Sequence, residues 1–392
     1  MPDNNKTQYE IFYVDTEEKL QQLCEQIQDA PILVIDTEFV REKTYRARLC
    51  LLQLATEDVV ACIDPIALNN ITPLMKIIND KNKIKVLHAA RQDYEIFYDL
   101  CSELPSPLFD SQIAASLLGY GEQVGYGALV AKILNIQLDK AHTRTDWSKR
   151  PLSQAQINYA CDDVVYLKEL YPILKQQLIE QNREHWLDDE FELLCQPELY
   201  ITRPEDAWKK LKGINKLRPR QLAAAMNIAE WRETVAIKKD RPRRWILADD
   251  IVLAASQLLA KDTKQLSSIA NIKPGIIEHS GEILLNCIKK AIVLGDDELP
   301  NREKPKRLTP NQEVVADLLL TQLKLIASEQ SISPANIANR KAIEKLIMGE
   351  KDIPLLQGWR FKIAGEQIHD LLLNKTALQI KDNKVVVFKV TQ

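Results

Sequence analysis

The chain has 392 residues, of which 45% are hydrophobic and 27% charged, and its formal net charge at pH 7 is −3. This composition is typical of a globular protein, and the length predicts two or three domains. We expect no membrane-spanning helix, because no apolar stretch approaches the ~20 residues that such a helix needs. The slightly acidic balance also argues against a nucleic-acid binder whose whole surface is basic.

The cysteines and the first residues favour a cytoplasmic protein. The seven cysteines include no Cys-x-x-Cys pair, and their odd number argues against a disulfide framework. The opening segment MPDNNKTQYE contains no apolar core that could serve as a signal peptide. Reduced cysteines are typical of the cytoplasm.

Residues 8 to about 200 alternate between strand and helix patterns. Short β-branched and apolar runs bounded by polar turns predict strands, and a period of 3.6 predicts helices. The strands are expected at 32–40, 48–56, 58–64 and 85–88, and the helices at 72–79, around Asp93, at 129–134 and at 154–180. Such alternation predicts a mixed sheet flanked by helices.

After Pro197 the strand patterns almost disappear. Residues 204 to about 288 predict four or five short helices, broken at Gly213, Pro219, Pro242 and Pro274. A charged, proline-bearing stretch from Gly295 predicts a linker. A second helical set is expected from Thr309 to about Leu378. The patterns therefore predict a helical C-terminal half in two parts.

Acidic residues occur where divalent cations could use them. Asp36 and Glu38 end an apolar strand, and the two-residue period of a strand places both carboxylates on one face. Tyr159 and Asp163 are four apart on a predicted helix, so they also share a face. Taken singly, each acid could be a surface charge or a helix cap. Because buried unpaired charges are costly and hard cations prefer oxygen ligands, a metal site is the alternative.

Three motifs in order resemble the DEDD exonuclease superfamily, and most closely the ribonuclease D family. The first is Asp36-Thr-Glu38-Phe39, the second His88-Ala-Ala-Arg-Gln92-Asp93, and the third Tyr159-Ala-Cys-Asp-Asp163. A tyrosine four residues before the last aspartate marks the DEDDy branch. The histidine branch would have histidine at 158, where this chain has asparagine.

This resemblance extends through nearly the whole chain and implies its fold. It implies an α/β ribonuclease H-like exonuclease domain at 1–200, followed by two all-α HRDC-like helical domains. The first helical domain is expected at 201–290, a linker at 291–307, and a second, diverged HRDC-like domain at 308–392. Because every strand pattern and all four acids precede residue 200, we also expect residues 1–200 to fold as a nuclease core without the rest.

The resemblance also implies a two-metal mechanism with Mg²⁺ or Mn²⁺. Asp36, Glu38 and Asp163 would hold one cation, and Asp36 would share the second with Asp93 at the leaving oxygen. Tyr159 would position the attacking water, because a phenol with a pKa of ~10 is a poor base at pH 7. Asp162 lies about 100° further around the helix, so we expect it to miss the metals and to be a surface charge.

Further residues are candidates for RNA contact, each with a structural alternative. Phe39 could stack on a terminal base or pack in the core, and His88 and Gln92 could contact RNA or only support the site. Arg144, Trp147 and Arg150 form a basic and aromatic segment that could line the substrate or support the site. Clustered lysines and arginines after residue 200 could track a phosphate backbone or be ordinary solvated surface; this cluster includes Lys209, Lys212 and Arg243.

The residues and the resemblance together predict a metal-dependent 3′→5′ exoribonuclease that releases nucleoside 5′-monophosphates. The resemblance points to RNA with a free 3′ end, such as tRNA precursors, as the substrate, and the sequence itself indicates no membrane and no obligate protein partner. A DNA 3′→5′ exonuclease would share every catalytic residue, since only contacts to the 2′-hydroxyl distinguish the two substrates. A non-catalytic RNA-binding module would be expected to lack one of the carboxylates, and all four are present.

Overall fold

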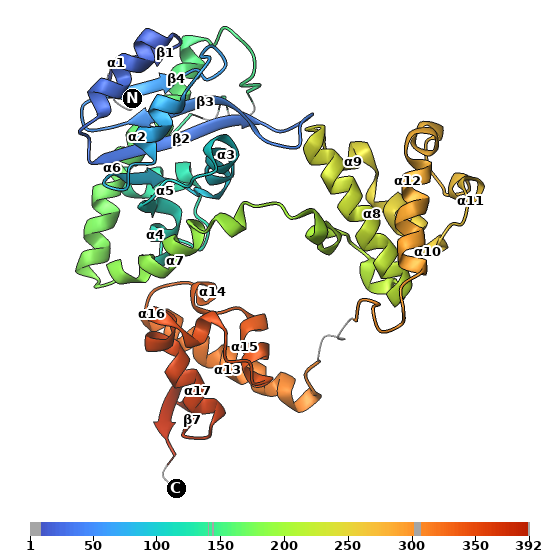
Figure 1. Cartoon of the computed structure of the whole chain (residues 1–392). Helices are drawn as coiled ribbons and strands as arrows, with labels where there is room; N and C mark the ends of the chain where they lie inside the picture. The colour runs from blue at the N-terminus through green and yellow to red at the C-terminus, as the bar shows by residue number, and fades with distance from the viewer. Residues whose placement is uncertain (1–8, 140, 143–144, 302–306, 391–392) are drawn as a thin grey trace. The chain divides into compact units, whose positions relative to one another are not determined.

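The computed structural model of the protein describes residues 9–139, 141–142, 145–301 and 307–390 (Figure 1). The chain forms two compact units. Unit 1 comprises Met1–Phe39, Leu49–Leu199 and Lys306–Gln392, and unit 2 comprises Val40–Arg48 and Tyr200–Pro305. The division differs from the three successive domains expected from the sequence, because the last segment belongs to the same compact unit as the first.

The N-terminal part of unit 1 contains a six-stranded mixed sheet in the order β1-β4-β3-β2-β5-β6. Its strands are β1 (Ile11–Val14), β2 (Ile32–Val40), β3 (Arg48–Ala55), β4 (Val60–Ile63), β5 (Ile84–Leu87) and β6 (Leu108–Asp110). β1 pairs in parallel with β4, β3 is antiparallel to β4, and β5 is parallel to both β2 and β6. The mixed sheet expected from the strand and helix alternation is therefore present.

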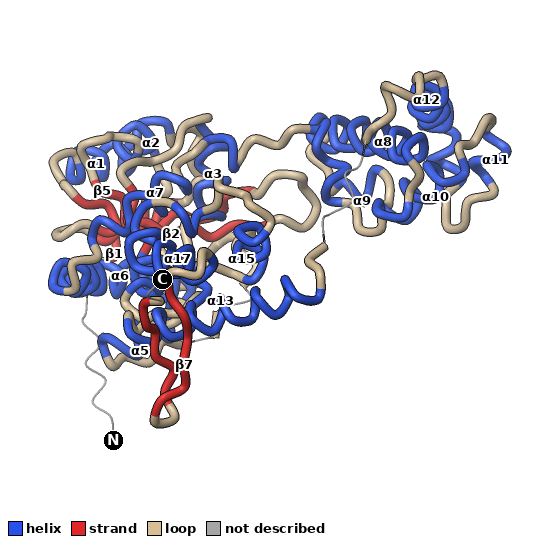
Figure 2. The backbone as a smooth tube through the Cα atoms, turned by 90° about the horizontal axis from the view of Figure 1, so that it is seen from below, coloured by secondary structure: helices blue, strands red, loops and turns tan. Residues whose placement is uncertain are grey.

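Helices surround this sheet, which forms an inner layer in Figure 2. They are α1 (Glu17–Ile27), α2 (Thr72–Ile78), α3 (Arg91–Cys101), α4 (Ser111–Leu117), α5 (Tyr126–Leu134), α6 (Gln154–Glu180), η1 (Glu184–Trp186), α7 (Leu187–Leu194) and η2 (Pro197–Leu199). The helices expected at 72–79, around Asp93, at 129–134 and at 154–180 correspond to α2, α3, α5 and α6. The elements β1, α1, β6 and α4 were not predicted from the sequence.

The long helix α6 positions part of the candidate site. A capping box begins it: Ser153 Oγ accepts from the backbone N–H of Gln156, and the Gln156 side chain accepts from the backbone N–H of Ser153. Its apolar face, which includes Ala160 and Val164, is fully buried, and the helix packs on β4 and β5. The cap and the packing fix the register of α6 against the sheet.

The C-terminal part of unit 1 is helical and ends in a β-hairpin. Its elements are α13 (Pro310–Glu329), α14 (Pro334–Ile337), α15 (Arg340–Ile347), η5 (Pro354–Leu356), α16 (Gly358–Arg360), η6 (Phe361–Gly365), α17 (Glu366–Leu372), β7 (Thr376–Lys381) and β8 (Lys384–Lys389). The hairpin corrects the expectation of an all-α segment. Asp382 and Asn383 have φ values of 50° and 59°, as a two-residue turn between antiparallel strands requires.

This C-terminal part packs on the helices that follow the sheet. The rings of Trp186 and Trp359 stack with centroids 4.5 Å apart and planes 8° from parallel. Glu190 accepts a hydrogen bond from Trp359 Nε1 at 3.3 Å and forms an ion pair with Arg360 at 2.5 Å. Arg183 donates to a backbone carbonyl in each of the two parts, at 2.7 and 2.6 Å.

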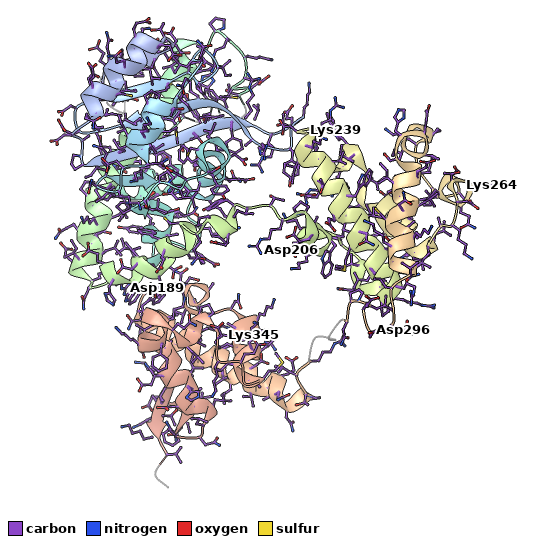
Figure 3. All side chains as sticks on the ribbon, viewed as in Figure 1. Asp189, Asp206, Lys239, Lys264, Asp296 and Lys345 are labelled. Atoms are coloured by element: carbon purple, nitrogen blue, oxygen red, sulfur yellow. The ribbon has the colours of Figure 1, made fainter. Side chains whose placement is uncertain are left out.

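Two glycines show how closely the parts approach. A Cβ atom on Gly119, whose φ is +83°, would lie 2.2 Å from the backbone oxygen of Ser331. A Cβ atom on Gly358, whose φ is +51°, would lie 2.0 Å from a carboxylate oxygen of Asp189, which Figure 3 labels. Gly119 therefore cannot carry a side chain unless backbone moves, whereas at Gly358 a side chain would need the Asp189 carboxylate to move and a left-handed φ to be tolerated. These contacts argue against the expectation that residues 1–200 fold independently of the rest, because truncation would expose Trp186 and leave Glu190 without Arg360.

We expect Trp359→Ala to destabilise unit 1 by about 3–5 kcal/mol, because it deletes a buried aromatic ring from this contact. Urea unfolding followed by circular dichroism measures the change. Trp245→Ala is the matched control, since Trp245 is 58% exposed and its loss should change stability by no more than about 0.5 kcal/mol. Equal stability of the two variants would contradict the packing described here.

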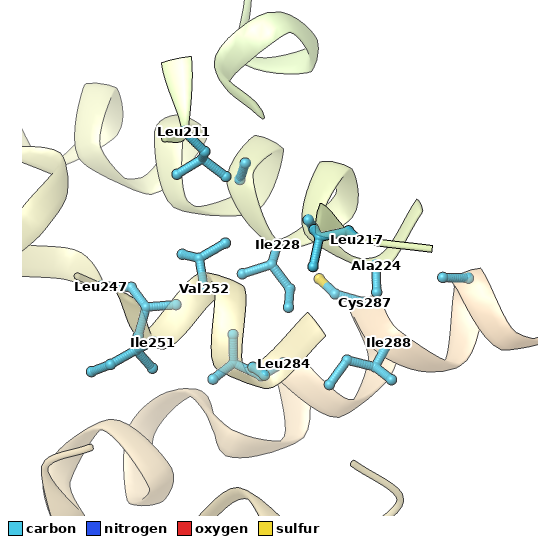
Figure 4. Packing of buried hydrophobic residues seen from close by; sticks show 14 of the residues in the cluster. Leu211, Leu217, Ala224, Ile228, Leu247, Ile251, Val252, Leu284, Cys287 and Ile288 are labelled. Atoms are coloured by element: carbon cyan, nitrogen blue, oxygen red, sulfur yellow. The ribbon is translucent and has the colours of Figure 1, made fainter. Parts of the chain in front are cut away.

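Unit 2 is helical, with a compact apolar core. Its elements are η3 (Pro204–Lys210), η4 (Ile214–Lys216), α8 (Pro219–Lys238), α9 (Arg243–Ile246), α10 (Asp249–Leu258), α11 (Thr263–Ser267) and α12 (Pro274–Ile292). Ile228, Val252, Leu284 and Ile288 are fully buried between α8, α10 and α12 (Figure 4). The expected helices are present, but α8 and α12 are long, and α12 continues to Ile292 within the stretch expected as a linker from 291.

The segment Val40–Arg48 belongs to unit 2 through contacts with α8 and the turn that follows it. Tyr45 donates its hydroxyl proton to the buried Glu233 at 2.5 Å. The backbone N–H groups of Tyr45 and Arg46 both donate to one carboxylate oxygen of Asp240 at 3.0 Å. Arg243 forms an ion pair with Glu233 at 3.0 Å and lies over the Tyr45 ring, 5.9 Å from its centroid.

Candidate active site

Three carboxylates meet between the sheet and α6. Asp36 and Glu38 alternate along β2 and Asp163 lies on α6, and one oxygen from each lies within 4.8 Å of the others. All three side chains are half-buried. The strand period and the position of α6 therefore bring together three of the four acids that the motifs singled out.

Asp93 lies in the first turn of α3, outside this group of three. It is buried, and its Oδ1 accepts a hydrogen bond from the hydroxyl of Thr37, the residue between Asp36 and Glu38. Its negative charge contributes to raising the pKa values of both Asp36 and Glu38. The fourth acid is thus close enough to interact electrostatically with the group, and Thr37 orients it.

Burial and mutual repulsion disfavour the ionised forms of these acids. Burial, followed by the charges of Asp163, Asp93 and Glu38, raises the pKa of Asp36 well above its usual range. Burial and the neighbouring aspartates raise the pKa of Glu38 to about 8. Burial is also the main cause that raises the pKa of Asp93 and that of Asp163 to about 7. A cation among these oxygens would offset both the cost of burying the ionised carboxylates and their mutual repulsion.

The donor set fits a hard divalent cation. Every ligand atom in the group of three is a carboxylate oxygen, the type that Mg²⁺, Mn²⁺ and Ca²⁺ prefer. Soft ligands are not part of this group, so the residues do not resemble a structural zinc site. The site can therefore hold a divalent metal, and its donor atoms do not identify which one.

Tyr159 and Asp163 line a pocket of about 660 Å³ together with Tyr126, Asp162 and residues of α5. The Trp147 ring stacks on the Tyr159 ring with centroids 6.3 Å apart and planes 24° from parallel. The His142 ring meets Tyr159 edge-on, with centroids 5.6 Å apart. Aromatic rings therefore flank the tyrosine one helical turn before Asp163.

The environment of Asp162 differs from the simple surface charge expected from the sequence. Its side chain is half-buried, and Oδ1 accepts a hydrogen bond of 2.5 Å from the Tyr9 hydroxyl. Its backbone carbonyl accepts from Tyr126 at 3.0 Å. Asp162 is not in the group of three acids. Its side chain instead connects α6 to the segment that precedes β1.

His88 has a structural environment. Its Nδ1 lies 2.9 Å from the Ser111 hydroxyl, its ring meets Tyr126 edge-on at 5.5 Å, and burial lowers its pKa. The nearby Asp110 accepts from the backbone N–H groups of Ala89 and Ala90 and also caps α4. Asp110 supports the site and was not predicted from the sequence, although an aspartate directly before a helix indicates such a cap.

The other candidates for RNA contact lie in different places. Phe39 is half-buried at the end of β2, and Gln92 is exposed in the first turn of α3. Lys209 and Lys212 are exposed in unit 2, where Lys209 pairs with Asp206 at 2.6 Å. Arg243 is engaged with Glu233 and Tyr45, which gives it a structural role. Arg144 lies outside the described residues.

Comparison with known proteins assigns the chain to a family. Residues 11–179 match the family model described as 3′-5′ exonuclease, and residues 221–288 match the HRDC domain model. The chain is 38% identical to the ribonuclease D of Bartonella henselae over 363 residues, which are 92% of this chain and 89% of that protein. The chain belongs to the ribonuclease D family. The ribonuclease D of Gluconacetobacter diazotrophicus is 36% identical over 95% of this chain and 93% of its own length.

A solved structure supports the same assignment. The crystal structure of Escherichia coli RNase D, described as an exoribonuclease involved in structured RNA processing, has a TM-score of 0.84 and 30% identity, over 93% of this chain and 99% of that one. The family and the α/β exonuclease domain followed by an HRDC region are confirmed. The prediction of a 3′→5′ exoribonuclease from the three motifs is also confirmed. Among the described residues, no helix of the chain is both long and apolar enough to cross a membrane.

The raised pKa values predict how stability changes with pH when no metal is bound. Unfolding returns these acids to pKa values near 4, so between about pH 4 and pH 8 the folded protein binds more protons than the unfolded chain. The free energy of unfolding therefore falls as pH rises through this window. Asp36→Asn removes one of the repelling charges, so in EDTA it should raise the melting temperature more at pH 8 than at pH 5. A stabilisation independent of pH would contradict the electrostatic description.

Proposed function

We propose that this ribonuclease removes nucleotides one at a time from RNA 3′ ends, releases nucleoside 5′-monophosphates, and acts on tRNA precursors in the cytoplasm. The observation that carries the proposal is the convergence of Asp36, Glu38 and Asp163 in a chain of the ribonuclease D family. The description of the E. coli protein as acting in structured RNA processing supports the choice of substrate. The presence of all four motif acids argues against a non-catalytic RNA-binding module.

The acids have distinct proposed roles. Asp36, Glu38 and Asp163 would hold one divalent cation, and Asp36 would share a second with Asp93. Divalent cations in such sites polarise the phosphodiester and lower the pKa of water. Thr37 holds the Asp93 carboxylate through its hydroxyl hydrogen bond, and Asp93 is proposed to act at the leaving oxygen. Mg²⁺ and Mn²⁺ both fit these oxygen donors.

Tyr159 is proposed to orient the attacking water rather than to remove its proton. Its position one helical turn from Asp163 and its place in the wall of the same pocket support this role. A phenol has an ordinary pKa of ~10, which makes it a weak base near neutral pH. Phe39 and Gln92, which flank the acids in the first and second motifs, are proposed to contact the terminal nucleotides. His88 is proposed to support the site through its contacts with Ser111 and Tyr126.

Unit 2 is proposed to bind the phosphate backbone of the RNA. Lys209 and Lys212 lie in a segment where Lys210 and Arg218 are also exposed, and positive charge on one segment suits a polyanion. Arg243 is the weakest of the candidates, because its guanidinium group already pairs with Glu233. We expect Arg243 to hold the neighbouring backbone in place rather than to contact phosphate.

We expect the combined variant Lys210→Ala, Lys212→Ala and Arg218→Ala to bind a tRNA-sized RNA more weakly. Each lost phosphate contact should reduce the slope of log affinity against log salt by about 0.7 to 0.9. The control removes the same charge from Lys261, Lys264 and Lys273, which are also exposed; Figure 3 shows Lys264 across unit 2 from Asp206. Equal slopes for the two triple variants would mean that the Lys210 to Arg218 segment is only solvated surface.

The substrate is tested with a precursor tRNA carrying a 3′ extension and a DNA of matched sequence and structure, each with Mg²⁺ and with Mn²⁺. We expect the RNA extension to be shortened to mononucleotides and the DNA to be degraded much more slowly, since only RNA carries a 2′-hydroxyl. Equal rates on both polymers would favour a DNA exonuclease. Rapid decay of an unstructured RNA with no action on the precursor would overturn the assignment to tRNA processing.

A further inference from the structure

Arg150 fixes the segment that precedes α6 through every N–H of its guanidinium group. Nε and one N–H of Nη2 donate to the two carboxylate oxygens of Asp64, at 2.5 and 2.7 Å. The other N–H of Nη2 donates to the backbone carbonyl of Cys50 at 2.6 Å. Nη1 donates to the backbone carbonyls of Trp147 and Lys149, at 2.7 and 2.8 Å. One side chain thus ties Trp147 to β3 and to the end of β4.

Asp64, which anchors this arginine, is itself held in place by hydrogen bonds. It follows β4 and is buried, and its oxygens also accept from the Tyr13 hydroxyl at 2.8 Å and from the backbone N–H of Ile66 at 2.9 Å. Although burial alone would raise its pKa, the hydrogen bonds from Arg150 and Tyr13 hold the pKa of Asp64 below its usual range. A bidentate arginine–carboxylate pair fixes orientation as well as distance.

The anchored segment reaches the candidate catalytic tyrosine through Trp147. The Trp147 ring is buried and stacks on the Tyr159 ring, within the range of centroid separations at which aromatic rings attract each other. The backbone carbonyl of Trp147 accepts a hydrogen bond from Arg150, so displacing the backbone that carries the indole would break that hydrogen bond. The chain of contacts therefore runs from Asp64 through Arg150 and Trp147 to Tyr159.

We propose that Arg150 and Asp64 are positioning residues that act on Tyr159 through Trp147. This inference rests on the proposed role of Tyr159 in orienting the attacking water. The indole limits the orientations of the phenol ring, and the arginine fork sets where the indole lies. Lysine at 150 keeps the positive charge but cannot reproduce the fork or all five hydrogen bonds.

A double-mutant cycle in the full-length protein separates this role from a purely structural one. The variants are Arg150→Lys, Tyr159→Phe and the two combined, assayed on RNA under single-turnover conditions. We expect Arg150→Lys to slow cleavage about tenfold or more with RNA affinity unchanged, as misplacement of a catalytic group does. In the Tyr159→Phe background, the same substitution should change the rate less than about twofold, because the residue it positions has lost its hydroxyl.

The control is Arg183→Lys, which also removes arginine hydrogen bonds to backbone carbonyls in unit 1 but holds the C-terminal helices. It should change the melting temperature without slowing single-turnover cleavage of a short RNA. An equal slowing by Arg150→Lys in both backgrounds would overturn the proposal, as would an unchanged rate in the wild-type background.

A second readout does not depend on activity. In protein labelled with 3-fluorotyrosine, the ¹⁹F resonance of Tyr159 is identified by its loss in Tyr159→Phe. We expect Arg150→Lys and Trp147→Phe to shift or broaden that resonance, and Arg183→Lys to leave it in place. An unmoved resonance overturns the positioning role even if the enzyme is active. A moved resonance with no effect of Tyr159→Phe on cleavage would instead show that the proposed role of Tyr159 is wrong.

Discussion

Asp36→Asn should slow RNA hydrolysis by about 10³-fold or more while the protein stays folded. Asp36 is the one acid proposed to serve both cations, and metal sites contribute several kcal/mol to such reactions, where each 1.36 kcal/mol is a factor of ten. The amide occupies nearly the same volume and removes one charge from a group whose members repel one another. Single-turnover cleavage at saturating Mg²⁺ measures the loss, and circular dichroism confirms the fold.

The matched control for this variant is Asp162→Asn. Asp162 is on the same helix as Asp163, and its carboxylate accepts from Tyr9 instead of joining the acid group. Its replacement should cost far less activity than Asp163→Asn, which we expect to resemble Asp36→Asn. Near-native turnover of either Asp36→Asn or Asp163→Asn would mean that these acids do not hold a catalytic metal.

Tyr159→Phe should slow turnover by about 10²-fold, the range expected when one positioned polar group is lost from the reacting centre. The variant keeps the ring that stacks on Trp147 and all four acids, so metal binding and stability should be retained. Single-turnover rates measure the chemical step, and the increase in melting temperature with Mg²⁺ checks metal binding. An unchanged rate would restrict Tyr159 to a packing role.

The sequence was sufficient to predict which side chains share a face wherever local periodicity determines the geometry. A two-residue period places Asp36 and Glu38 on one face of β2, and a four-residue spacing places Tyr159 and Asp163 on one face of α6. The same local reasoning could not show that Thr37 holds Asp93, because that hydrogen bond joins residues separated by 56 positions. The Arg150–Asp64 pair, separated by 86 positions, was beyond its reach for the same reason.

The C-terminal half shows more clearly what sequence patterns alone cannot predict. Helical periodicity predicted most of its elements but gave no signal that Trp359 stacks on Trp186 or that Gly358 must admit Asp189. The hairpin after Leu373 was missed, although Asp382 and Asn383 between alternating apolar residues are a recognisable turn. Arg243 looked like a phosphate ligand in a basic cluster, and only the folded chain shows its pairing with Glu233.

The most direct test of the central claim follows a single RNA labelled at its 5′ end in one sample and at its 3′ end in another. With Mg²⁺, the 5′-labelled RNA should shorten progressively through a ladder, while the 3′ label should appear at once as a nucleoside 5′-monophosphate. EDTA and Asp36→Asn should both abolish the two signals. Early release of a 5′-labelled mononucleotide, internal fragments, or undiminished cleavage in EDTA would contradict a metal-dependent 3′→5′ exoribonuclease.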